Sequence, residues 1–360
     1  MQYRNSVIHE AIRELEISDE PSVYKKVKRL ARKYIKRQVV EPIDIINWPK
    51  GCIAVGLMSQ VEVLEASDDP RDAVIAALIL STLKGYINRW IAKKYPVYLV
   101  DDCLFGQALL SLIKICEMYP ELADASEKAD YNKASANMMS FLYSHDKDIC
   151  GSLPYRPTHK TGDIYADSIG MVAPYAIRYG VMMEDDQAIE LGITQIRNFM
   201  KYGIDYATGV PYHVYSLSDG DDTTETSANG KYPGWGRALG WIFYGVRASY
   251  EVLVGTQYEP EIRKYLDRLS DIAEKLIDAN GLFGSNLLDK SEVDTSASAM
   301  IIYGLGKTHE KYLQAVESLI KYITEDGQVR GCQAECMGLG LYSDTYASYP
   351  WSVGMSLLVI

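Results

Sequence analysis

Carboxylate residues begin two apolar segments of this sequence. Asp167 precedes SIGMVAPYAIRYG, and the adjacent Asp101 and Asp102 precede CLFGQALLSLIKIC. An Asp before an apolar run often caps a helix, because its side-chain oxygen accepts a free backbone N–H of the first turn. Neighbouring residues point about 100° apart on a helix, so one carboxylate of the pair can cap while the other faces a cavity. Two carboxylates that meet in a cavity can perform general acid–base chemistry, and the sequence leaves open whether Asp101 or Asp102 joins Asp167.

Aromatic and cationic side chains accompany these carboxylates. The chain has 28 Tyr and only five Phe, and a tyrosine offers an apolar face together with a hydroxyl, which suits contact with sugar rings. Residues 203–236 have no helical period, and long irregular segments of compact domains are often functional. Trp235 and Trp241 alone would fit a core better than a binding site, but this pair accompanies Arg237 and a tyrosine-rich loop, which favours a sugar site. The candidate sugar-binding residues are Trp48, Tyr155, His159, His213, Trp235, Arg237, Trp241 and Trp351.

The elements that position these residues repeat along the chain. Six segments share a polar or aromatic cluster, a small residue about one turn later, and then an apolar run. The small residues recur every 55 to 70 positions, which indicates an internal repeat. They are Gly51, Gly106, Gly170, Gly240, Ala299 and Gly354.

More charged, amphipathic segments alternate with these six. A helix that is apolar all round is buried, whereas a helix with a charged face lies outside. We therefore expect two concentric rings of helices, an all-α (α/α)6 barrel, with the polar clusters of the inner helices gathered at one mouth. We expect residues 1–360 to form a single domain, with 1–21 as an N-terminal arm or helix. The predicted outer helices are 22–39, 71–94, 127–144, 186–202, 259–279 and 308–324.

The bulk composition excludes several kinds of partner. The formal net charge of −11 argues against nucleic acid and against an anionic membrane. Neither a signal-like N-terminus nor a run long enough to span a membrane is present. The six cysteines fit reduced thiols, and Cys332 and Cys336 have no nearby histidine that would suggest a metal site. We expect a cytoplasmic monomer or homodimer.

At these residues the chain resembles the unsaturated glucuronyl and rhamnogalacturonyl hydrolases, glycoside hydrolase families 88 and 105. The resemblance covers roughly residues 45–360. IYADSIGM resembles the stretch around the family's catalytic aspartate, which falls on Asp167. VDDCLFGQALL resembles the segment with the second carboxylate, which falls on Asp101, with Asp102 as the alternative. DTSASAM and YPWSVGMSLL also fit the family.

Two further motifs match in part. PYHVYSL keeps the family's histidine at His213, and PGWGRALGW keeps Trp235, Arg237 and Trp241. Val214 and Tyr215 replace a Gly-Trp pair after the histidine, and Ala238 and Leu239 replace a Gly-Asn pair after the arginine. We expect these four departures to lie on the substrate wall.

The resemblance implies a hydrolase that removes a terminal 4,5-unsaturated uronic acid from lyase-generated oligosaccharides by hydrating the C4=C5 double bond. It implies that Asp167 donates the proton and takes one from water. That role requires a raised pKa, which burial and a neighbouring carboxylate such as Asp101 would supply. Arg237 is expected to pair with a substrate carboxylate or hydroxyl, and Trp235 and Trp241 to form the sugar wall. No metal or cofactor is implied.

Two other functions fit the same pattern of residues. A 2-epimerase-like isomerase on this fold would depend on histidines at the mouth, and only His213 of the five histidines is well placed. A non-catalytic sugar-binding barrel would keep the aromatic residues without turnover. Loss of ultraviolet absorbance from a conjugated double bond would separate hydration from both.

Overall fold

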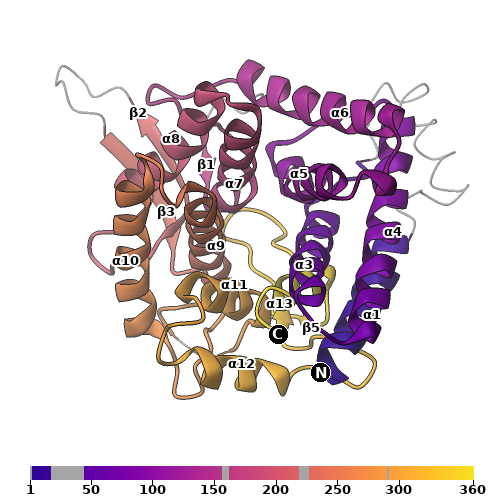
Figure 1. Cartoon of the computed structure of the whole chain (residues 1–360). Helices are drawn as coiled ribbons and strands as arrows, with labels where there is room; N and C mark the ends of the chain where they lie inside the picture. The colour runs from indigo at the N-terminus through magenta and orange to yellow at the C-terminus, as the bar shows by residue number, and fades with distance from the viewer. Residues whose placement is uncertain (1, 18–43, 156–161, 219–226, 290–291) are drawn as a thin grey trace, which may run out of the picture.

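The computed structural model describes residues 2–17, 44–155, 162–218, 227–289 and 292–360 (Figure 1). The six apolar segments form helices that lie at the centre of the molecule. Each of these inner helices contacts the next, and the last returns to the first, so the ring is closed. This confirms the predicted (α/α)6 barrel. The inner helices are α3 (Trp48–Glu65), α5 (Cys103–Met118), α7 (Ala166–Met183), α9 (Gly236–Leu253), α11 (Thr295–Leu305) and α13 (Pro350–Ser356).

The amphipathic helices surround this ring. Most of them start at an aspartate that accepts backbone N–H groups, as Asp69 and Asp185 do, and Asp124 forms a capping box with Glu127. Each outer helix contacts the inner helix that precedes it in the chain. The outer helices are α4 (Pro70–Ala92), α6 (Ala125–Ser144), α8 (Asp186–Tyr202), α10 (Glu259–Leu276) and α12 (Tyr312–Ile320).

The N-terminal helix α1 (Gln2–Glu16) lies where the ring closes. It contacts α3, α4 and α13, and Figure 1 shows the two chain ends near each other on that side. The outer helix predicted at 22–39 falls outside the described residues. No helix in the described ranges combines the length and the apolarity needed to cross a membrane.

Glycines allow the inner helices to approach each other closely. A Cβ atom on Gly56 of α3 would lie 2.0 Å from the carbonyl oxygen of Gly354 on α13, and a Cβ on Gly354 would lie 2.3 Å from that of Cys52. Real side chains do not reach such distances, so the two backbones touch directly. The same applies at Gly170, where a Cβ would collide with Trp241 at 2.7 Å. The small residues of the repeat therefore set the spacing of the ring.

Strands occur where the sequence was predicted to be irregular. Within 203–236, β2 (Tyr212–Ser218) and β3 (Ser227–Pro233) form an antiparallel pair, and β1 (Ile164–Tyr165) joins the free edge of β2. Tyr165 pairs with Val214, so β1 enters α7 directly beside β2. A second small pair joins β4 (Cys332–Gln333) to β5 (Tyr346–Ala347). Both pairs lie at the end of the barrel where the inner helices begin.

Candidate active site

A cavity of about 270 Å³ opens at the N-terminal ends of the inner helices. Its walls come from the starts of α3, α7 and α9, from the turn ahead of α5, from the β1–β2 pair and from the segment 335–339. Eight of the predicted site residues meet there. The lining residues are Trp48, Asp101, Tyr155, Tyr165, Asp167, Met171, His213, Trp235, Arg237, Trp241 and residues 335–339.

Asp167 lies in the first turn of α7 but does not cap the helix, since the N-cap position belongs to Tyr165 and has no side-chain hydrogen bond. Its Oδ2 is buried and accepts no hydrogen bond from the described part of the chain. Burial raises the pKa of Asp167 to about 7, the charge of Asp101 adds to the rise, and a backbone hydrogen bond and Arg237 oppose it. The side chain keeps 18% exposure. Asp167 is thus a carboxyl group that can gain or lose a proton near neutrality.

His213, on β2, faces Asp167 with its Nε2 3.6 Å from Oδ2. Its Nδ1 shares a hydrogen bond of 3.0 Å with the hydroxyl of Tyr342, and its ring lies 4.2 Å from that of Trp235. Burial, together with the charge of Arg237, lowers the pKa of His213 to about 3. The imidazole is therefore neutral, and it can exchange a hydrogen bond with Asp167 without forming an ion pair.

The two adjacent carboxylates have different surroundings. Both belong to the short 3₁₀ turn Val100–Asp102 ahead of α5. Asp101 lines the cavity, and its Oδ2 accepts a hydrogen bond of 2.7 Å from the hydroxyl of Tyr155. Asp102 instead accepts the backbone N–H of Tyr98 at 2.7 Å and is fully buried. The geometry therefore brings Asp101, and not Asp102, beside Asp167.

The pKa of Asp102 is also shifted, for reasons of its own. Burial raises its pKa well above the ordinary value, and a hydrogen bond with Asp44 and the charges of Asp44 and Asp101 add to the effect. Burial thus favours the protonated form of Asp102, a structural carboxyl group that does not line the cavity.

Arg237 lines the cavity, yet much of its guanidinium is committed to the protein. Nη1 donates to Asp294 at 2.9 Å and to the carbonyl of Gln333 at 2.7 Å, and Nη2 donates to the carbonyl of Ala334 at 2.8 Å. Asp294 in turn caps α11 through Ser296 and Ala297. Arg237 therefore ties the starts of α9 and α11 to the segment that forms one cavity wall.

The tryptophans form two layers. Trp48, Trp235 and Trp241 line the cavity, with Trp48 and Trp241 packed edge to face at 6.4 Å. Trp351 lies behind Trp48, with the ring centroids 4.7 Å apart, and stacks on Tyr349. It does not line the cavity. His159 falls outside the described residues.

The prediction that the four family departures lie on the substrate wall is wrong. Val214, Tyr215, Ala238 and Leu239 are all fully buried, and none lines the cavity. The side chains of successive strand residues point to opposite faces, which helps turn Val214 away from the site beside His213. On α9, Ala238 and Leu239 face the core while Arg237 and Trp241 face the cavity.

Several cavity residues were missed by sequence reasoning. Tyr165 precedes Asp167 by two positions within the quoted motif, and its ring packs against Tyr155 at 4.7 Å. Met171 is one helical turn after Asp167 on the same face. The segment 335–339 has no periodicity that could have marked it, although its two flanking strands and Gly338 and Gly340 are compatible with a turn.

Residues 23–360 match the sequence model of Glycosyl Hydrolase Family 88. The chain belongs to this family. It is also similar to the unsaturated rhamnogalacturonyl hydrolase YesR of Bacillus subtilis (strain 168), with 25% identity over 292 residues that cover 79% of this chain and 78% of YesR.

Solved structures of related enzymes share the fold of this family 88 chain. A family 105 glycoside hydrolase of C. acetobutylicum aligns with a TM-score of 0.68 at 22% identity, covering 92% of this chain and 97% of the other. A possible family 105 member from Klebsiella pneumoniae gives 0.73 at 14% identity, covering 99% and 91%. An unsaturated glucuronyl hydrolase of Bacillus sp. GL1 gives 0.60 at 14% identity, covering 98% and 95%. The barrel is thus the one these glycoside hydrolases use.

Proposed function

We propose that this family 88 glycoside hydrolase removes a terminal 4,5-unsaturated uronic acid from oligosaccharides left by polysaccharide lyases. The C4=C5 double bond of such a residue is conjugated to its carboxylate and to the ring oxygen. Protonation of C4 creates oxocarbenium character at C5, and water adds there. The resulting hemiketal opens and releases the remaining sugar. The observation that carries the proposal is a carboxyl group with a pKa of about 7, Asp167, inside an aromatic cavity.

Asp167 is assigned as the proton donor to C4. A general acid works best when its pKa lies near the working pH, and an ordinary aspartate would be almost fully ionised at neutrality. Once it has given its proton, the carboxylate can accept one from the attacking water. His213 supports both states because it is neutral: its ring can donate to the carboxylate or accept from the carboxylic acid across 3.6 Å.

Asp101 is assigned as the second carboxylate. Its negative charge contributes to the raised pKa of Asp167, and the hydrogen bond from Tyr155 fixes its orientation. In this position it stabilises the positive charge that develops on the sugar ring.

The tryptophans Trp48, Trp235 and Trp241 are assigned as the sugar wall. Arg237 is assigned a different task from the one expected, since three of its hydrogen bonds go to the protein. We assign it to hold residues 333–334, which lead into the cavity wall at 335–339, and to add to the effect of burial that keeps His213 neutral.

The sugar preference is proposed from the YesR relative, an unsaturated rhamnogalacturonyl hydrolase. We expect an unsaturated galacturonyl-rhamnose disaccharide to be turned over in preference to unsaturated glucuronyl disaccharides. Ultraviolet absorbance follows loss of the conjugated double bond across a panel of lyase products, with the saturated disaccharides as matched controls. Unchanged absorbance throughout the panel, or an epimerised reducing end as the product, would overturn the proposal.

We further propose a place for the enzyme in cytoplasmic polysaccharide degradation. All six cysteines are free thiols, which fits a reducing compartment. Cell fractionation with an antibody to the native chain tests this, and recovery in the extracellular fraction would contradict it.

A further inference from the structure

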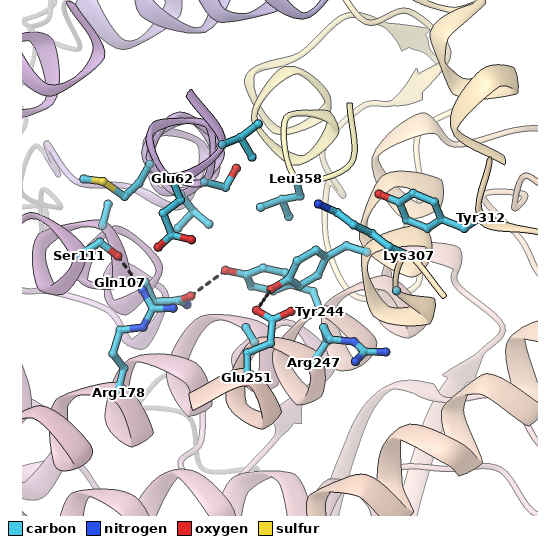
Figure 2. Close-up of a pocket in the computed structure, with 18 of the residues that line it drawn as sticks. Glu62, Gln107, Ser111, Arg178, Tyr244, Arg247, Glu251, Lys307, Tyr312 and Leu358 are labelled. Carbon is cyan, nitrogen blue, oxygen red and sulfur yellow. Dashed lines mark hydrogen bonds between the residues drawn. The ribbon is translucent and has the colours of Figure 1, made fainter. Parts of the chain in front are cut away.

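A second cavity opens at the other end of the barrel, where the inner helices finish (Figure 2). Its volume is about 470 Å³, within the range of about 300–1,000 Å³ typical of small-molecule sites. Its charged residues come from the later turns of separate inner helices: Glu62 from α3, Arg178 from α7 and Glu251 from α9, with Lys307 just after α11. The proposed hydration uses none of these residues.

A buried hydrogen-bonded layer separates the two cavities. Gln107 of α5 accepts the hydroxyl of Tyr244 at 2.7 Å and donates to the carbonyls of Gly170 at 3.1 Å and Met171 at 3.3 Å. Gln107 and Tyr244 line the second cavity, whereas the side chain of Met171 lines the first. The two cavities thus lie back to back on the barrel axis and are distinct sites.

Two of the cations in this cavity are available to a ligand. Arg178 is half-buried, and its one hydrogen bond within the described residues runs from Nη1 to the hydroxyl of Ser111 at 2.6 Å. No ion pair joins Arg178 or Lys307 to a carboxylate in the part of the chain that the structure describes. A guanidinium with free donors matches the planar geometry of a carboxylate.

Arg247, in contrast, is committed to the fold. It donates to the carbonyls of Gly304 at 2.9 Å and Leu305 at 3.1 Å, at the C-terminal end of α11. In Figure 2 its guanidinium points away from the centre of the cavity.

The same space also offers groups that bind hydroxyls. In Figure 2 the side chains of Glu62, Glu251 and Lys307 converge from different elements, and the hydroxyl of Tyr303 donates to Glu251 at 2.6 Å. Three Lys and Arg side chains against two Glu leave a net charge of one positive unit. This balance favours a ligand with one carboxylate and several hydroxyls over a phosphate dianion or an apolar molecule.

We propose that this cavity is a second ligand site, which binds a small polyhydroxylated monocarboxylate of the uronic acid class. Arg178 holds the carboxylate, and Lys307, Glu62, Glu251 and Tyr303, which lie on other sides of the cavity, bind the hydroxyls. The proposal does not depend on the reaction at the other end of the barrel.

Titration calorimetry of the full chain with D-galacturonate and with D-glucuronate tests the site. We expect one uronate per chain. Binding should weaken about tenfold in Arg178→Gln and in Lys307→Gln, whose lysine is exposed. The control variant Arg89→Gln, at an exposed arginine on outer helix α4, should bind as the wild type does. Saturating the catalytic cavity with an unsaturated disaccharide, in an Asp167→Asn background that does not turn it over, should leave uronate binding in place.

Four results overturn the proposal. Three of them are the absence of uronate binding at millimolar concentration, binding that Arg178→Gln and Lys307→Gln both leave unchanged, and equally tight binding of neutral D-galactose or of inorganic phosphate. Competition between the disaccharide and the uronate would place the uronate in the catalytic cavity and also overturn it. Because Lys307 is exposed, its variant remains informative if Arg178→Gln destabilises the fold.

Discussion

The adjacent carboxylates Asp101 and Asp102 provide a matched pair of substitutions with opposite expected results. Asp101→Asn removes the charge that helps to raise the pKa of Asp167 and weakens the hydrogen bond from Tyr155. We expect the loss of this charge-stabilising carboxylate to lower kcat by about 10²–10³-fold. Asp102→Asn keeps an oxygen for the backbone N–H of Tyr98 and places an amide donor toward Asp44, so kcat should stay close to the wild-type value.

Stability should separate the two variants as well. The pKa of Asp102 is raised from 3.8 by folding, so the folded chain binds this proton more tightly than the unfolded chain does. Stability from this group is therefore full below pH 3.8 and declines as pH rises toward the folded pKa, by at most about 1.4 kcal/mol per pH unit. Asparagine does not titrate, so the unfolding free energy of Asp102→Asn should improve relative to wild type as pH rises.

Two assays decide the matter: ultraviolet turnover of an unsaturated disaccharide, and urea unfolding at pH 5 and pH 8. If Asp102→Asn lost as much activity as Asp101→Asn, or if its relative stability fell between pH 5 and pH 8, the assignment of the two carboxylates would be refuted.

Other predictions concern the ring and its buried charge. Gly56→Ala should destabilise the protein by about 3 kcal/mol in urea unfolding, because its Cβ would lie 2.0 Å from the carbonyl oxygen of Gly354; equal or greater stability would contradict the direct contact of α3 and α13. The control Gly85→Ala, on the outer helix α4 with no heavy atom closer than 3.9 Å, should stabilise by about 0.5–1 kcal/mol. Arg237→Gln should cost about 3–5 kcal/mol, because it leaves Asp294 buried and uncompensated; lost turnover with an unchanged melting curve would instead indicate direct substrate contact.

The ring could be predicted from the sequence because each inner helix carries a local signal. An apolar run with an early small residue can be recognised within one segment. Gly56 and Gly354 show that the absence of a side chain lets the backbones of α3 and α13 touch. The predicted outer helix 186–202 has the same bounds as α8. Asp167 could be singled out for a related reason, since its motif precedes such a run.

The rest of the site depends on contacts between distant parts of the chain. Arg237 donates hydrogen bonds to Gln333 and Ala334, which lie nearly 100 residues later in the chain. No local sequence pattern predicts these contacts. The wall at 335–339 is irregular backbone that Arg237 holds in place. Likewise, the burial of Val214 follows from the pairing of β2 with β1 and β3, which depends on the register of the strands rather than on composition.

The central claim is that Asp167 is the acid, and the pH dependence of kcat/KM on an unsaturated disaccharide tests it most directly. The acid must be protonated to act, so we expect kcat/KM to fall as pH rises through about 7, the pKa of Asp167, and Asp167→Asn to be inactive with a native circular dichroism spectrum. A rate that stays level to pH 9, or an Asp167→Asn variant that turns over like wild type, would contradict the account.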